Sequence, residues 1–239
     1  MRTRLLAMGL AMLVVACGDT GRERVEVPLV ATGTPAREVV AGTARVTLTR
    51  ADVAFGPAYF CASEAGRAEL CEVAAAELRA AAAIRALDPV AQPLGTIQAV
   101  TGEVRSTVYD LGMPWLITQP QPTAQPAAPE GHSAVLEGTL VDGARSLRFR
   151  AVLDVTPASR GDAALSGQRT RHVIGESTGL TLVVDPSAWV DRLDVAALFA
   201  LDADGDGAVV IPPGSASHES VLQGMLARAP VRFVWREVE

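Results

Sequence analysis

Three aspartates at alternate positions are the residues of this sequence best suited to binding a metal ion. Residues 202–207 read D-A-D-G-D-G, and Val209 follows them at an apolar position. Calcium takes several hard oxygen ligands, which alternating aspartates around a glycine turn can supply. The stretch therefore predicts a calcium site, and its alternative is an acidic turn that binds no metal.

The same stretch resembles the first half of an EF-hand loop. The resemblance ends at the twelfth position, where that loop carries a bidentate glutamate and this chain has Pro213. It therefore covers only Asp202, Asp204 and Asp206. A calcium ion held there would stabilise the fold.

The three histidines, His132, His172 and His218, offer a second kind of chemistry. No second histidine lies within four residues of any of them. Copper binding would need the fold to bring histidines together with a methionine such as Met113 or Met225.

Other catalytic patterns are missing from the sequence. His218 and Glu219 begin an H-E-x-x-H pattern, but Leu222 stands where the second histidine belongs. There is no G-x-S-x-G elbow, and no glycine-rich phosphate loop follows a strand. His132 and Ser133 are chain neighbours, which does not make them a catalytic pair. We predict that the chain is not an enzyme, with a hydrolase as the alternative.

The N-terminal residues indicate export. Arg2 and Arg4 precede an apolar run of about a dozen residues, shorter than the roughly 20 that a membrane-spanning helix needs. A basic start followed by a short apolar run is typical of a secretory signal. Residues 13–17, L-V-V-A-C, resemble the lipobox of bacterial lipoproteins. The resemblance implies a signal peptide over 1–16, acylation of Cys17 and a lipidated tether over 17–24.

Two further predictions follow from the lipobox. The residue after Cys17 is Gly18 and not an aspartate, which resembles the pattern of Gram-negative lipoproteins that are sorted to the outer membrane. We therefore expect the chain to be held on the periplasmic face of the outer membrane. Cys61 and Cys71 then lie outside the cytoplasm, where disulfides persist, and we predict that they are linked. A metal-binding cysteine pair is the alternative, weakened by their long spacing.

Composition excludes one class of partner. The chain has 239 residues, no lysine and 49% hydrophobic residues. Without Arg2 and Arg4 its 21 basic residues fall to 19, against 27 acidic residues, which is a net charge of −8. An acidic surface of this kind argues against nucleic-acid binding.

The hydropathy pattern predicts a mainly β fold with α insertions. Residues 45–50, 97–111, 134–140, 147–155, 180–185 and 231–235 have strand-like patterns, and Pro28 suggests that residues 25–29 form an edge strand. Alanine-rich residues 71–86, the segment after Asp185-Pro186 and a segment capped by Ser217 read as helices. We expect a β-sandwich-like single domain over 25–239 with two or three helices and a proline-rich loop at 119–129.

The chain as a whole resembles envelope lipoproteins of the myxobacterial kind. The lipobox, V-T-L-T-R-A-D-V-A-F-G-P-A-Y-F-C at 46–61 and S-A-W-V-D-R-L-D-V at 187–195 carry this resemblance, which implies no activity. The layout is also similar to copper-binding envelope lipoproteins with a β-sandwich body, although no metal residue can be carried over. We expect a non-enzymatic, lipid-anchored binding or structural module, with copper binding as the alternative.

Overall fold

The computed structural model describes residues 21–64, 71, 74–113, 123–156, 165–166, 171–227 and 230–238. Strands make up 51% of the chain, and this part of it contains two α-helices. The prediction of a mainly β domain with few helices is therefore confirmed. No helix in these ranges is both long and apolar enough to cross a membrane.

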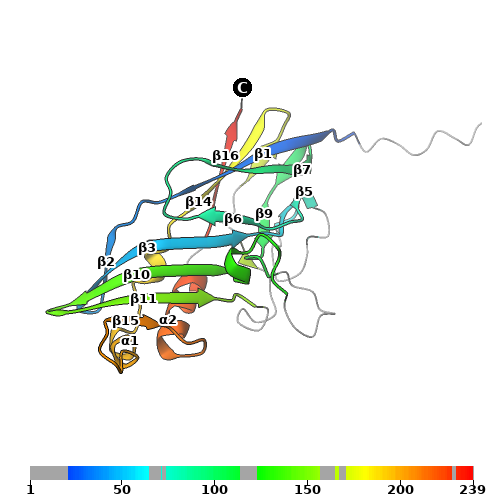
Figure 1. The fold of residues 1–239 in the computed structure, drawn as a ribbon. Helices are drawn as coiled ribbons and strands as arrows, with labels where there is room; N and C mark the ends of the chain where they lie inside the picture. The colour runs from blue at the N-terminus through cyan, green and yellow to red at the C-terminus, as the bar shows by residue number, and fades with distance from the viewer. Residues whose placement is uncertain are drawn as a thin grey trace, which may run out of the picture.

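One curled sheet has eight strands and contains the N-terminal strand near its middle (Figure 1). β1 pairs with β7 in antiparallel fashion and with β14 in parallel. The order across the sheet is β12 (Leu165–Ser166), β9 (Ser106–Tyr109), β4 (Ala58–Cys61), β5 (Ala74–Leu78), β7 (Gln92–Val100), β1 (Arg24–Gly33), β14 (Thr178–Val184) and β16 (Arg232–Glu237).

The second sheet is built on the long strand β3 and its hairpin neighbours. β10 pairs along most of its length with β3 on one side and with β11 on the other. Its order is β15 (Ala208–Val210), β11 (Arg145–Leu153), β10 (Ala134–Asp142), β3 (Ala44–Phe55) and β2 (Glu38–Ala41), with β6 (Ala82–Arg85) also paired to β3. A separate small pair joins β8 (Gly102–Val104) to β13 (His172–Ile174).

The core lies between the inward faces of the two large sheets. On β3, Val46 and Leu48 are buried, whereas the alternate residues Arg45, Thr47 and Thr49 reach solvent, as the period-two pattern predicts. Aromatic side chains fill one part of this core, where Phe233 lies 5.8 Å from Phe60 and 5.7 Å from Tyr109 between ring centres. The alternating strands at 45–50, 134–140 and 147–155 are thus confirmed.

The two helices lie beside β11 and β15 (Figure 1). A 3-10 turn, Pro186–Trp189, follows the cap at Asp185, and α1 (Val195–Ala200) begins separately at Asp194, so the predicted helix is broken into two. α2 (Ala216–Ala227) packs on the 3-10 turn at Gly224, where a Cβ would lie 2.2 Å from the carbonyl oxygen of Trp189. The capping hydroxyl is that of Ser215, which accepts from the His218 N–H; Ser217 instead donates to Asp194.

The predicted helix over 71–86 is wrong. Residues 74–78 form β5 and residues 82–85 form β6, which belong to different sheets. Alanine favours a helix by only a few tenths of a kcal/mol per residue over most residue types, and pairing with β4 and β7 outweighs that preference. Small side chains also suit this place, because Ala75 and Ala76 are almost fully buried.

The edge position predicted for β1 is also wrong. β1 lies between two strands, yet Pro28 is tolerated because the parallel pairing with β14 starts only at Leu29. The missing N–H of Pro28 therefore falls where β1 has a partner on one side alone.

Candidate functional site

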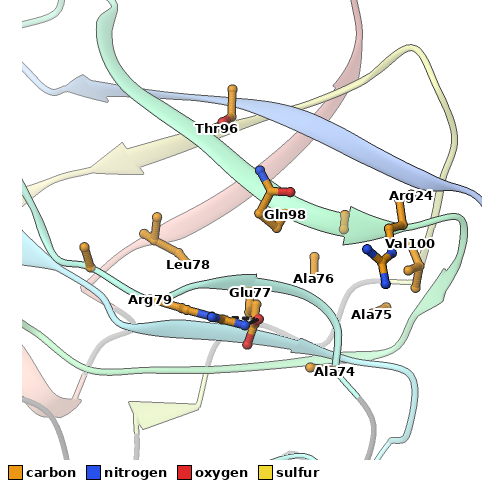
Figure 2. Close-up of a pocket in the computed structure, with 12 residues that line it drawn as sticks. Arg24, Ala74, Ala75, Ala76, Glu77, Leu78, Arg79, Thr96, Gln98 and Val100 are labelled. Carbon is orange, nitrogen blue, oxygen red and sulfur yellow. Dashed lines mark hydrogen bonds and ion pairs between the residues drawn. The ribbon is translucent and has the colours of Figure 1, made fainter.

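A groove of about 680 Å³ lies where β5 and β7 meet on the eight-stranded sheet (Figure 2). The two strands share just two residue pairs, Ala76 with Ala99 and Glu77 with Gln98. Beyond Leu78 the chain leaves this sheet and enters β6 of the other one. The groove therefore forms because two neighbouring strands diverge and because several of the side chains that line it are the methyl groups of alanines.

The rim of this groove carries the polar side chains. Arg79 donates through Nε to Glu77, 2.9 Å away, and Gln98 donates to Glu26 at 3.1 Å. Arg24 stands at one end of the groove beside Val100, and it has no ion-pair partner among the described residues. The arrangement can hold an elongated ligand on an alanine floor, with hydrogen-bonding groups along its sides and an available cation at one end.

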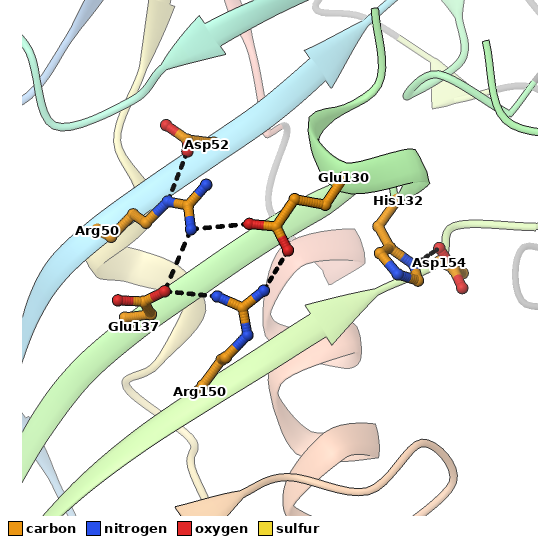
Figure 3. A network of polar contacts seen from close by, with 7 residues as sticks. All are labelled: Arg50, Asp52, Glu130, His132, Glu137, Arg150 and Asp154. Carbon is orange, nitrogen blue, oxygen red and sulfur yellow. Dashed lines mark hydrogen bonds and ion pairs between the residues drawn. The ribbon is translucent and has the colours of Figure 1, made fainter. Parts of the chain in front are cut away.

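A network of charges crosses three strands of the six-stranded sheet (Figure 3). Arg50 on β3 contacts Asp52 at 2.7 Å, Glu130 at 2.9 Å and Glu137 at 3.2 Å. Arg150 on β11 contacts Glu137 at 2.5 Å and also binds Glu130. Each of the two glutamates is thus shared by both arginines.

Glu130 holds an unusual position in this network. It lies in a 3-10 turn, Pro129–Gly131, with φ of 53°, a left-handed conformation that non-glycine residues seldom adopt. Hydrogen bonding to Arg50, with further help from Arg150, keeps the pKa of its carboxyl below the ordinary value. The two arginines therefore hold a strained turn against the sheet.

The histidines lie on separate elements, and the structure does not bring them together. Next to the network, Nδ1 of His132 lies 2.9 Å from Asp154. The buried Ser133 hydroxyl instead accepts from the N–H of Val155. Adjacent extended residues point to opposite sides, so His132 and Ser133 do not form a nucleophile–base pair.

The other two histidines are packed into the fold. The ring of His172 stacks on Trp235 at 4.6 Å, and burial lowers its pKa. Nε2 of His218 faces the Val152 carbonyl oxygen at 3.2 Å. Nε2 of His172 and Nδ1 of His218 are buried without a hydrogen-bond partner among the described residues.

Two of the aspartates predicted to bind calcium accept hydrogen bonds from backbone N–H groups of their own turn. Asp202 accepts from the Gly207 N–H at 3.3 Å, and Asp206 accepts from the Ala208 N–H at 2.8 Å. Within the described ranges no three histidine, cysteine or acidic side chains gather closely enough to hold a metal ion. Calcium at Asp202, Asp204 and Asp206 stays a prediction, and a melting curve unchanged by a chelator would count against it.

The cysteine predictions divide between described and undescribed parts of the chain. Cys61 and Cys71 form a disulfide with their Cα atoms 5.5 Å apart, which confirms the predicted pair. The bond joins the end of β4 to the segment that leads into β5, one wall of the groove. Cys17, the predicted signal peptide at 1–16 and the first half of the tether, residues 17–20, lie outside the described residues.

Neither the groove nor the charge network was predicted from the sequence. The sequence holds one weak indication of the network: Arg148 and Arg150 alternate with apolar residues, which places both arginines on the outer face of one strand. The groove had none, because its floor consists of the alanines that suggested a helix.

The fold is that of a single β-rich domain with curled sheets. No family model and no curated protein matches the chain. Among solved structures, MbnP from Methylosinus trichosporium is similar, with 8% identity over 91% of this chain and 99% of that chain and a TM-score of 0.42. A likeness at this level assigns no residue role.

Proposed function

We propose that the chain is a lipid-anchored binding module of a bacterial envelope, attached through Cys17 and holding its ligand in the groove between β5 and β7. The observation that carries the proposal is the disulfide Cys61–Cys71 in a chain with a lipobox at 13–17. Disulfides persist outside the cytoplasm, which is also where lipoproteins are acylated. The two features are independent and agree on one compartment.

The groove supports binding as the role of the anchored body. Its lining includes five alanines, and its rim offers the amide of Gln98, the Arg79–Glu77 ion pair and the cation of Arg24. Such a mixture of an apolar floor and a few polar groups is typical of ligand sites. We propose a non-enzymatic role in which the rim residues bind the ligand by contact and hydrogen bonding.

The anchor is tested by expressing the full chain in a Gram-negative host. We expect the mature N-terminal peptide to begin at Cys17 and to carry the mass of a diacylglyceryl group and an amide-linked acyl chain. A Cys17→Ala variant is the matched control, and it should leave the membrane fraction. A wild-type chain that remains in the aqueous fraction without lipid mass would refute the proposal.

A further inference from the structure

The backbone of β7 alternates between its two neighbouring strands. The Thr101 N–H donates to the Glu23 carbonyl oxygen at 2.8 Å, so these two residues are a directly hydrogen-bonded pair in the antiparallel register of β1 and β7. In such a ladder every second residue directs its N–H and C=O to the same neighbour. Residues 97, 99 and 101 therefore bond to β1, whereas Gln98 and Thr96 direct their backbone groups toward β5.

β5 pairs with Gln98 but leaves the backbone groups of Thr96 free. Glu77 lies opposite Gln98 at the last pair that the two strands share in this direction. In the same register Arg79 would face Thr96, but β5 ends at Leu78, and Arg79 and Thr96 stand on opposite sides of the groove (Figure 2). The N–H and C=O of Thr96 thus have no strand partner on this side among the described residues, and Thr96 is exposed.

The two faces of this gap differ in polarity. Thr96 points to the outer face of the sheet, since its neighbour Ile97 is fully buried. The exposed guanidinium of Arg79 contacts Glu77 beside the groove. On the inner side the groove is lined by Leu78, a half-buried side chain that packs against the core. A strand in the gap would therefore meet polar groups on one face and an apolar group on the other.

From these observations we infer that the ligand of the groove is an extended peptide, which adds to β7 as a short strand where β5 ends. The peptide residue opposite Thr96 accepts a hydrogen bond from the Thr96 N–H and donates one to its C=O. This residue is polar and points outward, and the apolar residues on either side of it meet Leu78. In strand addition of this kind the main chain supplies affinity and alternate side chains supply selectivity. The inference rests on the proposed function, because it names the class of ligand held in that groove.

The test uses the full acylated chain in lipid nanodiscs, with empty nanodiscs as the blank. The probe is the peptide Val-Thr-Val-Thr-Val-amide with fluorescein at its N-terminus, because valine and threonine favour extended chains. Its binding is measured by fluorescence anisotropy. With the valines against Leu78, the N–H groups of the threonines face Thr96. N-methylation of both threonines should therefore weaken binding about tenfold, whereas N-methylation of the second and third valines should leave it unchanged.

Variants of Thr96 test the same hydrogen bond from the side of the protein. Thr96→Pro removes an N–H that the ladder with β1 does not use, so the variant should fold. It should bind the unmethylated peptide about fivefold more weakly. Thr96→Ala, which keeps the N–H, is the matched control and should bind as the wild type does. The methylated peptides need no variant, so they decide the question even where Thr96→Pro is unfolded.

The apolar dye 8-anilinonaphthalene-1-sulfonate separates this inference from the proposed function. Peptide binding that depends neither on the threonine N–H groups nor on Thr96→Pro would overturn strand addition. A chain that binds the dye, more weakly after Thr96→Trp, but does not bind the peptide would overturn the inference and leave the groove as a ligand site. A chain that binds neither probe would overturn both the inference and the role proposed for the groove.

Discussion

The two large sheets differ in how the charged side chains on their surfaces are paired. On the six-stranded sheet Arg50 and Arg150 share two glutamates, so the charges of three strands satisfy one another. On the eight-stranded sheet the strands diverge over alanines, and Arg24 at the end of the resulting groove has no described ion-pair partner. Each sheet carries a pocket, and the two differ in how fully the charges beside the pocket are paired.

The difference between the two surfaces comes from side-chain size at the strand junctions. Long side chains on β3, β10 and β11 span the distance between strands and pair with one another beside a second pocket of about 490 Å³. Methyl groups on β5 cannot do so, and an open groove results. In the proposed function the groove is the ligand site, whereas the groups of the charged network pair with one another.

Removing the disulfide should have the largest effect, and it should be confined to the groove side. Cys61→Ala with Cys71→Ala opens a loop with a sequence separation of 10, which should lower the free energy of unfolding by about 2–3 kcal/mol. Urea unfolding of the full chain measures this change. Hydrogen exchange should quicken in β4 and β5 and remain unchanged in β10 and β11. Equal quickening in both sheets would show that the two surfaces are not independent.

Glu130 tests the charged surface from two sides. Glu130→Ala removes its ion pairs and keeps the left-handed backbone, whereas Glu130→Gly removes the same ion pairs and relieves the strain. Both variants should be less stable than the wild type. The glycine variant should fold with an equilibrium constant roughly five- to thirtyfold larger than the alanine variant. Equal urea midpoints for the two variants would mean that the turn has changed conformation and that the network does not hold it.

The alternation of apolar and polar residues along single strands made much of the fold predictable. The rest depends on which distant strands pair and in what register, which no local pattern records. The strand around Val46 and Leu48 could be read from its period of two, because one face is buried and the other is wet. The Cys61–Cys71 pair followed from compartment and count. Residues 74–78 could not be assigned locally, since alanine fits a buried strand pair as well as a helix.

The candidate sites depended on contacts that no local pattern records. Arg50 and Glu130 are 80 residues apart, and they meet only because β3 and β10 pair in one particular register. The Asp202 turn, by contrast, is a purely local pattern. It suggested metal ligands, which stays a prediction, and in the fold Asp202 and Asp206 accept backbone N–H groups of the same turn.

Acid should weaken the two regions in different pH ranges. Burial lowers the pKa of His172, so the folded chain takes up this proton less readily than the unfolded chain, and stability present above the ordinary value of 6.5 is lost as the pH falls below it. Arg50 lowers the pKa of Glu130, and Arg145 lowers that of Asp142, so their contributions are lost only as the pH falls below about 4.5 and 3.8. Hydrogen exchange at pH 7.5, 5.5 and 3.5 should show β8 and β16 weakening before β10.

His172→Phe is the control for the upper range. It keeps a flat ring against Trp235 and removes the titrating group. The loss of protection between pH 7.5 and 5.5 should disappear in this variant. If the loss persists, another group titrates there and the separation of the two ranges is wrong.

Filling the groove should have the smallest effect on stability and the clearest effect on binding. Thr96→Trp places a large ring among the alanines from an exposed position on β7, so the free energy of unfolding should change by no more than about 0.5 kcal/mol. The anionic apolar dye 8-anilinonaphthalene-1-sulfonate serves as the probe, because its ring suits the alanine floor and its sulfonate suits Arg24. The variant should bind the dye about tenfold more weakly, equivalent to about 1.4 kcal/mol. Val40→Trp, at an exposed position on β2 of the six-stranded sheet, is the matched control. Equal dye binding by both variants would mean that the dye does not bind in the groove between β5 and β7. The two sheets would then not differ in their ability to bind it.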